Sequence, residues 1–184
     1  MTAPRPGGLH ADAVRVLRDW RPPDPAQEQL RGEFLRHLAD HPDGVWRECA
    51  AGHITASTAV MDDSGSRVLL TLHGKLKAWL QLGGHCEPGD TTLAEAALRE
   101  AVEESGIADL RLLPDPVQID RHRVPCHPQG SYHLDVQYVA IAPPQARHRI
   151  SGESDDLRWF PVDAIPEPTD DVVRRLVARA TAAL

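Results

Sequence analysis

Residues 83–107 read GGHCEPGDTTLAEAALREAVEESGI, a segment with six carboxylates and a single arginine, Arg99. Three of the carboxylates, Glu100, Glu103 and Glu104, lie within five consecutive positions. Like charges at this spacing repel one another and destabilise a helix by about 0.2–0.5 kcal/mol per pair. A bound divalent cation would turn that repulsion into ligation, and sites made of oxygen ligands suit hard ions such as Mg²⁺ or Mn²⁺. The crowded charge therefore predicts a metal-binding surface.

The same segment carries the signals of an amphipathic helix over about 92–105. Thr92 and Glu95 have the spacing of a capping box, and Gly106 is a typical helix stop. At helical periodicity the three glutamates share one face, opposite an alanine-rich apolar stripe. An isolated E-x-x-E-E pattern is usually a solvated acidic face. Here a predicted turn at Gly83–Gly84, the adjacent arginine and the glycine stop favour the metal-binding interpretation.

These residues resemble the signature of the Nudix hydrolases. That signature is Gly, five residues, Glu, seven residues, Arg-Glu, an apolar residue, any residue, Glu-Glu, any residue, Gly and an apolar residue. Gly84 opens the pattern here, Asp90 stands in place of the first Glu, and 99–107 match the remainder. Eight residues instead of seven separate Asp90 from Arg99, so we expect a longer loop or first helical turn and no firm role for Asp90.

The resemblance implies a Nudix-type α/β/α sandwich with a mixed β-sheet and hydrolysis of a nucleoside diphosphate linked to another moiety. It also implies an Mg²⁺ (or Mn²⁺) cofactor, which lowers the pKa of an attacking water and neutralises phosphate charge. The implied metal ligands are Glu100, Glu103, Glu104 and a main-chain carbonyl at Gly83 or Gly84. The implied catalytic residues are Glu103, Glu104, Glu153 as a candidate general base, and Arg99, which would orient the carboxylates.

Four residues are predicted to contact the substrate: His85, Lys75, His133 and Asp135. His85 follows Gly83–Gly84 directly, which would place it near the bound phosphates. His133 and Asp135 face the same side of their predicted strand because side chains alternate. The pairing of GGH with HLD at 133–135 resembles a subset of the family in which both occur.

The chain has ten histidines, of which His122 and His53 are weaker candidates for the same cleft. Ordinary hydrogen bonding at strand ends is the competing interpretation for all of these histidines. Neither Cys49 with His53, nor His122 with Cys126 and His127, has the paired CxxC spacing typical of zinc sites, so zinc is not predicted. Three cysteines at irregular spacing argue against a disulfide framework, and Cys86 is predicted to be a small buried side chain.

The rest of the chain predicts an α/β domain with an N-terminal helical extension. We place the extension at 1–50 and the Nudix hydrolase domain at 51–184. Apolar periodicity predicts two helices before residue 42 and a last helix over about 169–183. The predicted strands are HITASTAVMD, RVLLTLH, AWLQL, PVQID, YHLDVQYVAIA and DLRWFPV.

The composition narrows the classes of partner. A net charge of −7 argues against a nucleic acid polymer as the main partner. The chain lacks the long apolar run of a membrane span and the pattern of a signal peptide, so no membrane partner and a cytoplasmic location are expected. The amphipathic extension makes a homodimer possible, and the expected partner is a nucleotide or other diphosphate substrate.

Two alternatives from other functional classes stay open at this point. The first is a non-catalytic Nudix-fold nucleotide sensor, although such proteins tend to lose the motif carboxylates that this chain keeps. The second is an isoprenoid diphosphate isomerase of the same fold, which needs a reactive cysteine opposite a glutamate. Cys86 is the only cysteine near the motif.

Overall fold

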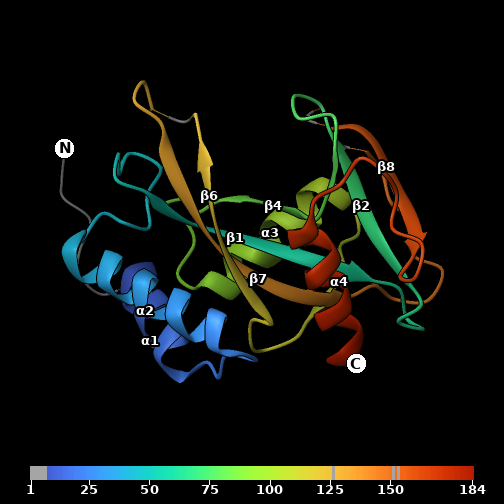
Figure 1. Ribbon diagram of the computed structural model, residues 1–184. Coiled ribbons are helices and arrows are strands. Elements are labelled where there is room, and N and C mark those ends of the chain that lie inside the picture. The colour runs from blue at the N-terminus through green and yellow to red at the C-terminus, as the bar shows by residue number, and fades with distance from the viewer. Residues whose placement is uncertain (1–7, 126, 151, 153) are drawn as a thin grey trace.

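The computed structural model describes residues 8–184 apart from 126, 151 and 153. Within these residues, helices cover both faces of one mixed sheet (Figure 1). The helices are α1 (Leu9–Asp19), α2 (Pro25–Asp40), α3 (Leu93–Ser105) and α4 (Asp171–Ala182). The strands are β1 (His53–Met61), β2 (Arg67–His73), β3 (Trp79–Leu80), β4 (Leu82–His85), β5 (Arg111–Leu112), β6 (Gln118–Val124), β7 (Ser131–Ile141) and β8 (Ser154–Pro161).

The sheet is built around β1 and β7, which run parallel over their shared length, from His53 beside His133 to Met61 beside Ile141. The other edge of β1 is shared by two antiparallel strands, β4 at one end and β2 at the other. β7 is shared in the same way by β6 and β5, while β3 and β8 pair with β2. Each central strand therefore changes its antiparallel partner along its length.

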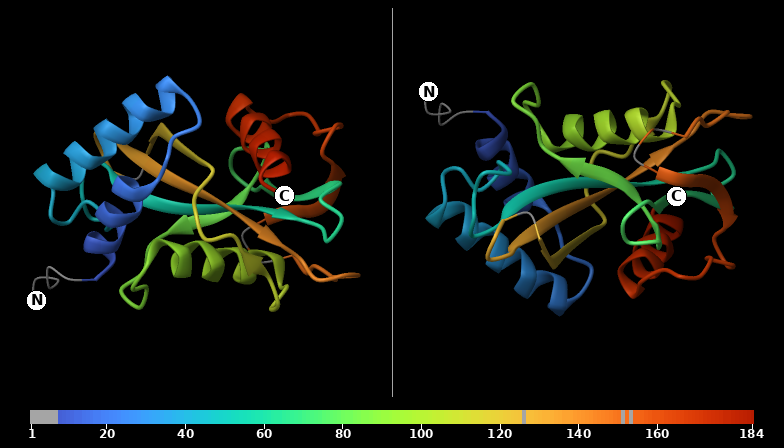
Figure 2. Two further views of the ribbon diagram at one scale, coloured as in Figure 1. Left: turned by 90° about the horizontal axis from the view of Figure 1, so that it is seen from below. Right: turned by 90° about the horizontal axis from the view of Figure 1, so that it is seen from above.

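The two faces of the central strands differ in chemistry because side chains alternate along a strand. Ile54, Ala56 and Val136 lie on the face that packs against α1 and α3, in one hydrophobic cluster. On the opposite face, Ala59 and Met61 pack against α4. Figure 2 shows α3 and α4 on opposite sides of the sheet in both views. The apolar packing on the α4 side covers only one end of β1, and polar side chains occupy the rest.

α3 has the ends that its sequence predicts. The Thr92 side chain accepts a hydrogen bond from the Glu95 backbone N–H and the Glu95 side chain returns to Thr92, which completes the capping box. Gly106 ends the helix in the left-handed conformation, with a φ of 68°. The helix buries its apolar side against the sheet through Leu93, Ala96, Ala97 and Ala101. The acidic side of the helix lies beside β4, where Glu104 accepts a hydrogen bond from the Gly83 backbone N–H.

The N-terminal helices pack into the same core as the sheet. Leu9, Leu17 and Phe34 belong to the hydrophobic cluster that contains β1 and α3 residues. The Gln27 side chain exchanges two hydrogen bonds with the backbone of Ile119 on β6, at 2.8 and 2.9 Å. The domain boundary predicted at residue 50 stays a prediction, since the two parts share one core.

Most predicted elements agree with the structure, including the mixed α/β sandwich and the N-terminal helices. The predicted turn at Gly83–Gly84 is wrong, because both glycines lie in β4 and pair with β1. A Cβ on Gly83 would lie 2.3 Å from the Cβ of Ser57, so glycine is needed there for the close approach of two strands. The sequence reading also missed β5. Among the described residues, no helix is long and apolar enough to cross a membrane.

Candidate active site

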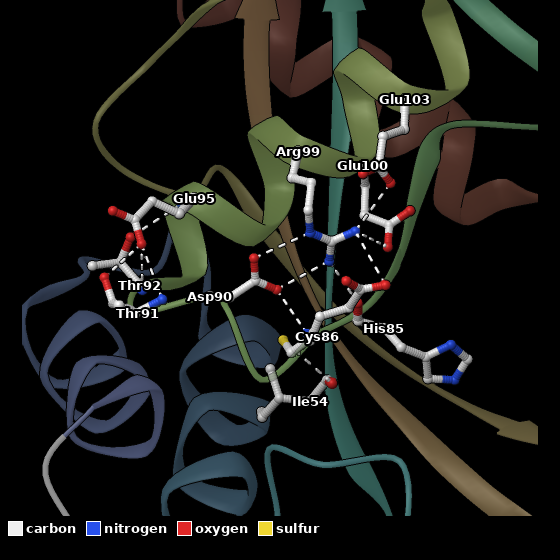
Figure 3. A network of polar contacts seen from close by, with 11 residues as sticks. Ile54, His85, Cys86, Asp90, Thr91, Thr92, Glu95, Arg99, Glu100 and Glu103 are labelled. Atoms are coloured by element: carbon white, nitrogen blue, oxygen red, sulfur yellow. Dashed lines mark hydrogen bonds and ion pairs between the residues drawn. The ribbon is translucent and has the colours of Figure 1, made fainter.

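Arg99 connects the groups of the motif (Figure 3). Its Nε and Nη2 donate to the two carboxylate oxygens of Asp90, at 3.1 and 3.0 Å. Its Nη1 donates to Glu100 at 3.0 Å and to Glu103 at 3.1 Å. Nη2 also donates to the backbone oxygen of His85 on β4, at 3.0 Å. One planar guanidinium thus ties the loop before α3, the acidic face of α3 and the edge strand β4 together.

Asp90 is an anchor of this arrangement. Its residue is only 8% exposed, and its carboxylate accepts from Arg99 and also from the Glu87 backbone N–H at 2.7 Å. The hydrogen bond that Arg99 donates to Asp90, partly opposed by burial, raises the pKa of Arg99 further above its usual range. The expectation that Asp90 has no firm role is therefore wrong. Aspartate replaces glutamate at this motif position and still reaches the arginine.

Glu100 is largely enclosed, with 16% of its side chain exposed. Burial raises the pKa of its carboxyl group, while the Arg99 charge acts in the opposite direction. A Cβ added to Gly84 would lie 2.8 Å from the Glu100 carboxylate. The absence of a side chain at Gly84 therefore leaves the space in which this carboxylate lies against β4.

The other two glutamates complete an oxygen-rich face at the C-terminal half of α3. Glu104 accepts a hydrogen bond from the Gly83 backbone N–H at 2.9 Å. The Glu103 side chain is 59% exposed and extends to Arg99. The three carboxylates and the neighbouring backbone of β4 are hard oxygen donors, which fit Mg²⁺ or Mn²⁺. The predicted ligand residues Gly83, Gly84, Glu100, Glu103 and Glu104 thus lie together.

Replacing Gly84 with alanine should lower activity without unfolding the protein. The new Cβ meets the end of a flexible side chain, Glu100, and not the backbone, so the carboxylate must move away from β4. We expect kcat/KM to fall roughly 10–100-fold, as for other losses of ligand orientation. Steady-state kinetics at several Mg²⁺ concentrations, with the melting temperature, will measure both effects.

Gly89→Ala is the matched control for that experiment, because a Cβ at Gly89 meets nothing within 4 Å. This variant should keep the activity and melting temperature of the unsubstituted protein. Equal activity of the Gly84→Ala and Gly89→Ala variants would contradict the assigned role of Glu100.

Three histidines meet on the sheet face opposite α3. The ring centroids of His53 and His85 are 5.1 Å apart, and each of these rings is 4.9 Å from that of His133. The His85 ring projects away from Arg99 even though its backbone oxygen binds that arginine (Figure 3). His122 lies next to His133, with centroids 5.3 Å apart. The predicted residues His85 and His133 are therefore neighbours, and His53 and His122 join them.

The protonation behaviour of these rings separates His122 from the others. Burial and the neighbouring imidazoles lower the pKa of His53 to about 4 and that of His133 to about 3. Burial also lowers the pKa of His85. In contrast, the hydrogen bond from His122 to Asp120, 2.9 Å long, raises the pKa of His122. His53 and His133 are consequently uncharged at neutral pH.

Asp135 lies two residues after His133 on the same face and is buried. Its carboxylate accepts from Thr55 at 2.9 Å, from Ser57 at 2.6 Å and from Gln137 at 2.8 Å. The Gln81 amide adds a longer contact of 3.4 Å. Asp135 therefore links the polar side chains of β1 and β7 on this face through hydrogen bonds.

The remaining predicted residues lie elsewhere. Lys75 is exposed in the turn at 74–76, where its backbone N–H donates to the His73 ring. Among the described residues, no hydrogen bond or ion pair joins the Lys75 side chain to the motif. Glu153 lies outside the described residues. A hollow of about 410 Å³ lies between α2, β6 and α4. It is not lined by residues of the 83–107 segment.

Comparison with known proteins identifies this arrangement. A sequence model of the NUDIX domain matches residues 52–180. A NUDIX-family hydrolase from Clostridium perfringens is 27% identical and superposes with a TM-score of 0.56 over 71% of this chain and 95% of that one. An Ap4A hydrolase from C. elegans, 20% identical, gives a TM-score of 0.60 over 71% of this chain and 96% of its own.

The NUDIX domain of Shewanella oneidensis NrtR, in complex with ADP ribose, is 18% identical with a TM-score of 0.56, covering 80% of this chain and 96% of that domain. No curated protein sequence matches the chain. The domain match spans well over half of the chain and includes every motif residue described above. The chain therefore belongs to the Nudix hydrolase family and is an enzyme of the pyrophosphohydrolase type.

Proposed function

We propose that the protein hydrolyses the diphosphate bond of a nucleoside diphosphate linked to another moiety and requires Mg²⁺ (or Mn²⁺). The observation that carries this proposal is the convergence of Glu100, Glu103 and Glu104 beside the backbone of β4. Arg99 holds two of these carboxylates in place and is itself fixed by Asp90.

Each residue of the site has a proposed role. Glu100, Glu103 and Glu104, with a carbonyl at Gly83 or Gly84, would hold the cation, which neutralises diphosphate charge and lowers the pKa of an attacking water when bound. Glu103, Glu104 and Glu153 are the candidates for removing the proton from that water. The guanidinium of Arg99 keeps the carboxylates in a fixed orientation.

The polar face of the sheet is the proposed place for the linked moiety. His85, His133 and Asp135 lie there, within a region where the central strands carry buried polar side chains. Lys75, in an exposed turn, stays a candidate contact for the phosphates. The names of two related structures, an Ap4A hydrolase and a domain bound to ADP ribose, suggest dinucleoside polyphosphates and nucleoside diphosphate sugars as the first compounds to test.

A substrate panel tests the proposal directly. With Mg²⁺ present, we expect turnover of at least one nucleoside diphosphate derivative, with products that correspond to cleavage between two phosphorus atoms. Removing divalent cations with EDTA should abolish turnover, and Mn²⁺ or Mg²⁺ should restore it. Chromatography of the nucleotide products gives the bond cleaved. Absence of turnover across the panel, together with tight nucleotide binding by calorimetry, would favour the sensor function.

The isomerase alternative is disfavoured by the surroundings of Cys86. This cysteine is 6% exposed, and its thiol lies 3.9 Å from the Ile54 carbonyl oxygen. Burial raises the pKa of the thiol to about 12, which is the opposite of what a reactive cysteine needs.

A homodimer formed through the N-terminal helices and a cytoplasmic location both remain predictions. The amphipathic character of 9–40 is the basis for the first, and the N-terminal sequence for the second.

A further inference from the structure

We propose that His53, His85 and His133 form a binding site for a transition-metal ion of the zinc class, separate from the carboxylate site on α3. Each ring offers a nitrogen, and these three nitrogen atoms all lie within 4.8 Å of one another. The site draws one ligand from each of three adjacent strands, β1, β4 and β7. It lies on the sheet face opposite the one that packs against α3.

Strand register explains why the rings converge. His53 is the direct neighbour of His133 in the parallel pair of β1 and β7. His85 pairs with Thr55, two residues along β1, and therefore projects to the same face as His53. Tetrahedral zinc with bonds of about 2.0–2.1 Å needs ligand nitrogens about 3.4 Å apart. Small rotations of the three rings would bring them from the present spacing to that one.

Ring nitrogens of His53 and His85 are buried without a well-formed hydrogen bond, which an ion would correct. His53 is fully buried, and neither of its ring nitrogens makes a hydrogen bond of good geometry among the described residues, although a contact with the Cys49 backbone acts against the fall in its pKa. Nε2 of His85 is also buried without such a bond. Buried polar side-chain atoms almost always have a partner, so two adjacent histidines with this property point to a missing ligand. A metal ion would give a partner to the buried nitrogens of His53 and His85 at once.

The chemistry of the cluster selects the class of ion. Neutral imidazole is a preferred ligand of Zn²⁺, Cu²⁺, Ni²⁺ and Fe²⁺, whereas Mg²⁺ prefers oxygen. A phosphate group fits less well, because the three ring nitrogens, all within 4.8 Å of one another, converge as the ligands of one ion do. Three protein ligands leave a coordination position open for water or for an oxygen of a bound molecule. The cluster thus resembles an open metal site more than an anion site.

The residues around the three histidines are also consistent with a metal site. His122 lies against His133 and is oriented by its hydrogen bond to Asp120. The Asp135 network lies one step further along β1 and β7, where Thr55 and Ser57 hold the carboxylate. The His122 ring packs against that of His133 and would restrict its rotation. The proposal does not rest on hydrolytic activity, because metal content and unfolding report on it directly.

The test uses the full chain, first stripped of metal with a chelator and then titrated with ZnCl₂. We expect uptake of one Zn²⁺ per chain at this cluster, measured by equilibrium dialysis and elemental analysis. At a free Zn²⁺ concentration about 100 times Kd, the melting temperature should rise by roughly 5–10 °C. Co²⁺ in place of Zn²⁺ should give the visible absorption spectrum of a tetrahedral site with nitrogen ligands.

Two variants make the site assignment falsifiable. His133→Gln should weaken Zn²⁺ binding roughly 100-fold or more, since even indirect ligand support contributes 10–100-fold. His53→Met should abolish the zinc-induced rise while the metal-free protein melts at the same or a higher temperature. That second result is expected because an apolar side chain replaces a buried polar one that lacks a well-formed hydrogen bond. A hydrogen-bonding role for His53 would instead lower the melting temperature of the metal-free protein.

Three controls separate this cluster from other ligands. His148→Gln removes a half-exposed histidine outside the cluster and should change nothing. Cys49→Ser removes the thiol from a second group of potential ligands, His41, Asp43 and Cys49, and should also keep the zinc response. The Glu103→Gln/Glu104→Gln variant should keep it as well. Absence of zinc uptake, or uptake that survives both histidine variants, would overturn the proposal.

Discussion

The Glu103→Gln/Glu104→Gln double variant should lose on the order of 1,000-fold or more in kcat/KM, because two charged ligands of the proposed cation site are removed. Glutamine keeps the shape of each side chain and an oxygen that still accepts the hydrogen bonds from Arg99 and from Gly83. The fold should therefore persist, with a melting temperature close to that of the unsubstituted protein. Product release from the best substrate of the panel, measured at saturating Mg²⁺, gives the loss.

Glu95→Gln provides the matched control on the same helix. Glu95 completes the capping box at the start of α3, and glutamine serves equally at that position. Glu95→Gln removes one negative charge, against two in the double variant, and lies two turns before Glu103. If Glu95→Gln keeps full activity while the double variant is inactive, the loss of kcat/KM belongs to the proposed cation site. If the double variant turned over substrate at the normal rate, the metal-ligand assignment would be wrong.

Arg99→Met should reduce the free energy of unfolding by about 3–5 kcal/mol, the range found when one partner of a buried ion pair is removed. The Asp90 side chain is 6% exposed and Arg99 itself is 21% exposed, so water cannot readily replace the lost partner. Urea unfolding followed by circular dichroism measures the change. Activity should fall too, because Glu100 and Glu103 lose their common donor.

The exposed pair of Arg174 with Glu167 gives the comparison, since its glutamate side chain is 75% exposed. Arg174→Met should cost less than about 1 kcal/mol. Adding Asp90→Asn to Arg99→Met should destabilise by less than the sum of the two single changes, with a coupling of about 1–3 kcal/mol. Strictly additive losses would mean that Asp90 and Arg99 do not act as one unit.

The site on α3 could be predicted because its information is local. Glu100, Glu103 and Glu104 share a face through helical periodicity alone, and Thr92 and Gly106 mark the ends of the helix. Asp90 was undervalued because one extra residue changed the motif spacing. Distance along the chain does not fix distance in space when a loop can absorb a residue.

The histidine cluster could be predicted only in part, because its geometry depends on strand register. Sequence reasoning found His85 and His133 and kept His53 as a weaker candidate, but it judged zinc by cysteine spacing. The contact of His53 with His133 comes from a parallel pairing across 80 residues of sequence. Nothing within either strand specifies its partner or its direction. Glycines were also misread, since Gly83 and Gly84 serve close packing inside a strand and not a turn.

Asp12, in the N-terminal extension, contacts the start of α3 in the NUDIX domain. The Asp12 carboxylate on α1 accepts a hydrogen bond of 2.8 Å from the Leu93 backbone N–H, in the first turn of the helix that carries the glutamates. The family match begins only at residue 52, so this acceptor comes from outside the shared core. A shortened chain would expose Ile54 and Leu93 to water, an apolar surface that promotes aggregation. The extension thus caps the acidic helix and shares its hydrophobic cluster, and loss of solubility would accompany removal of the extension.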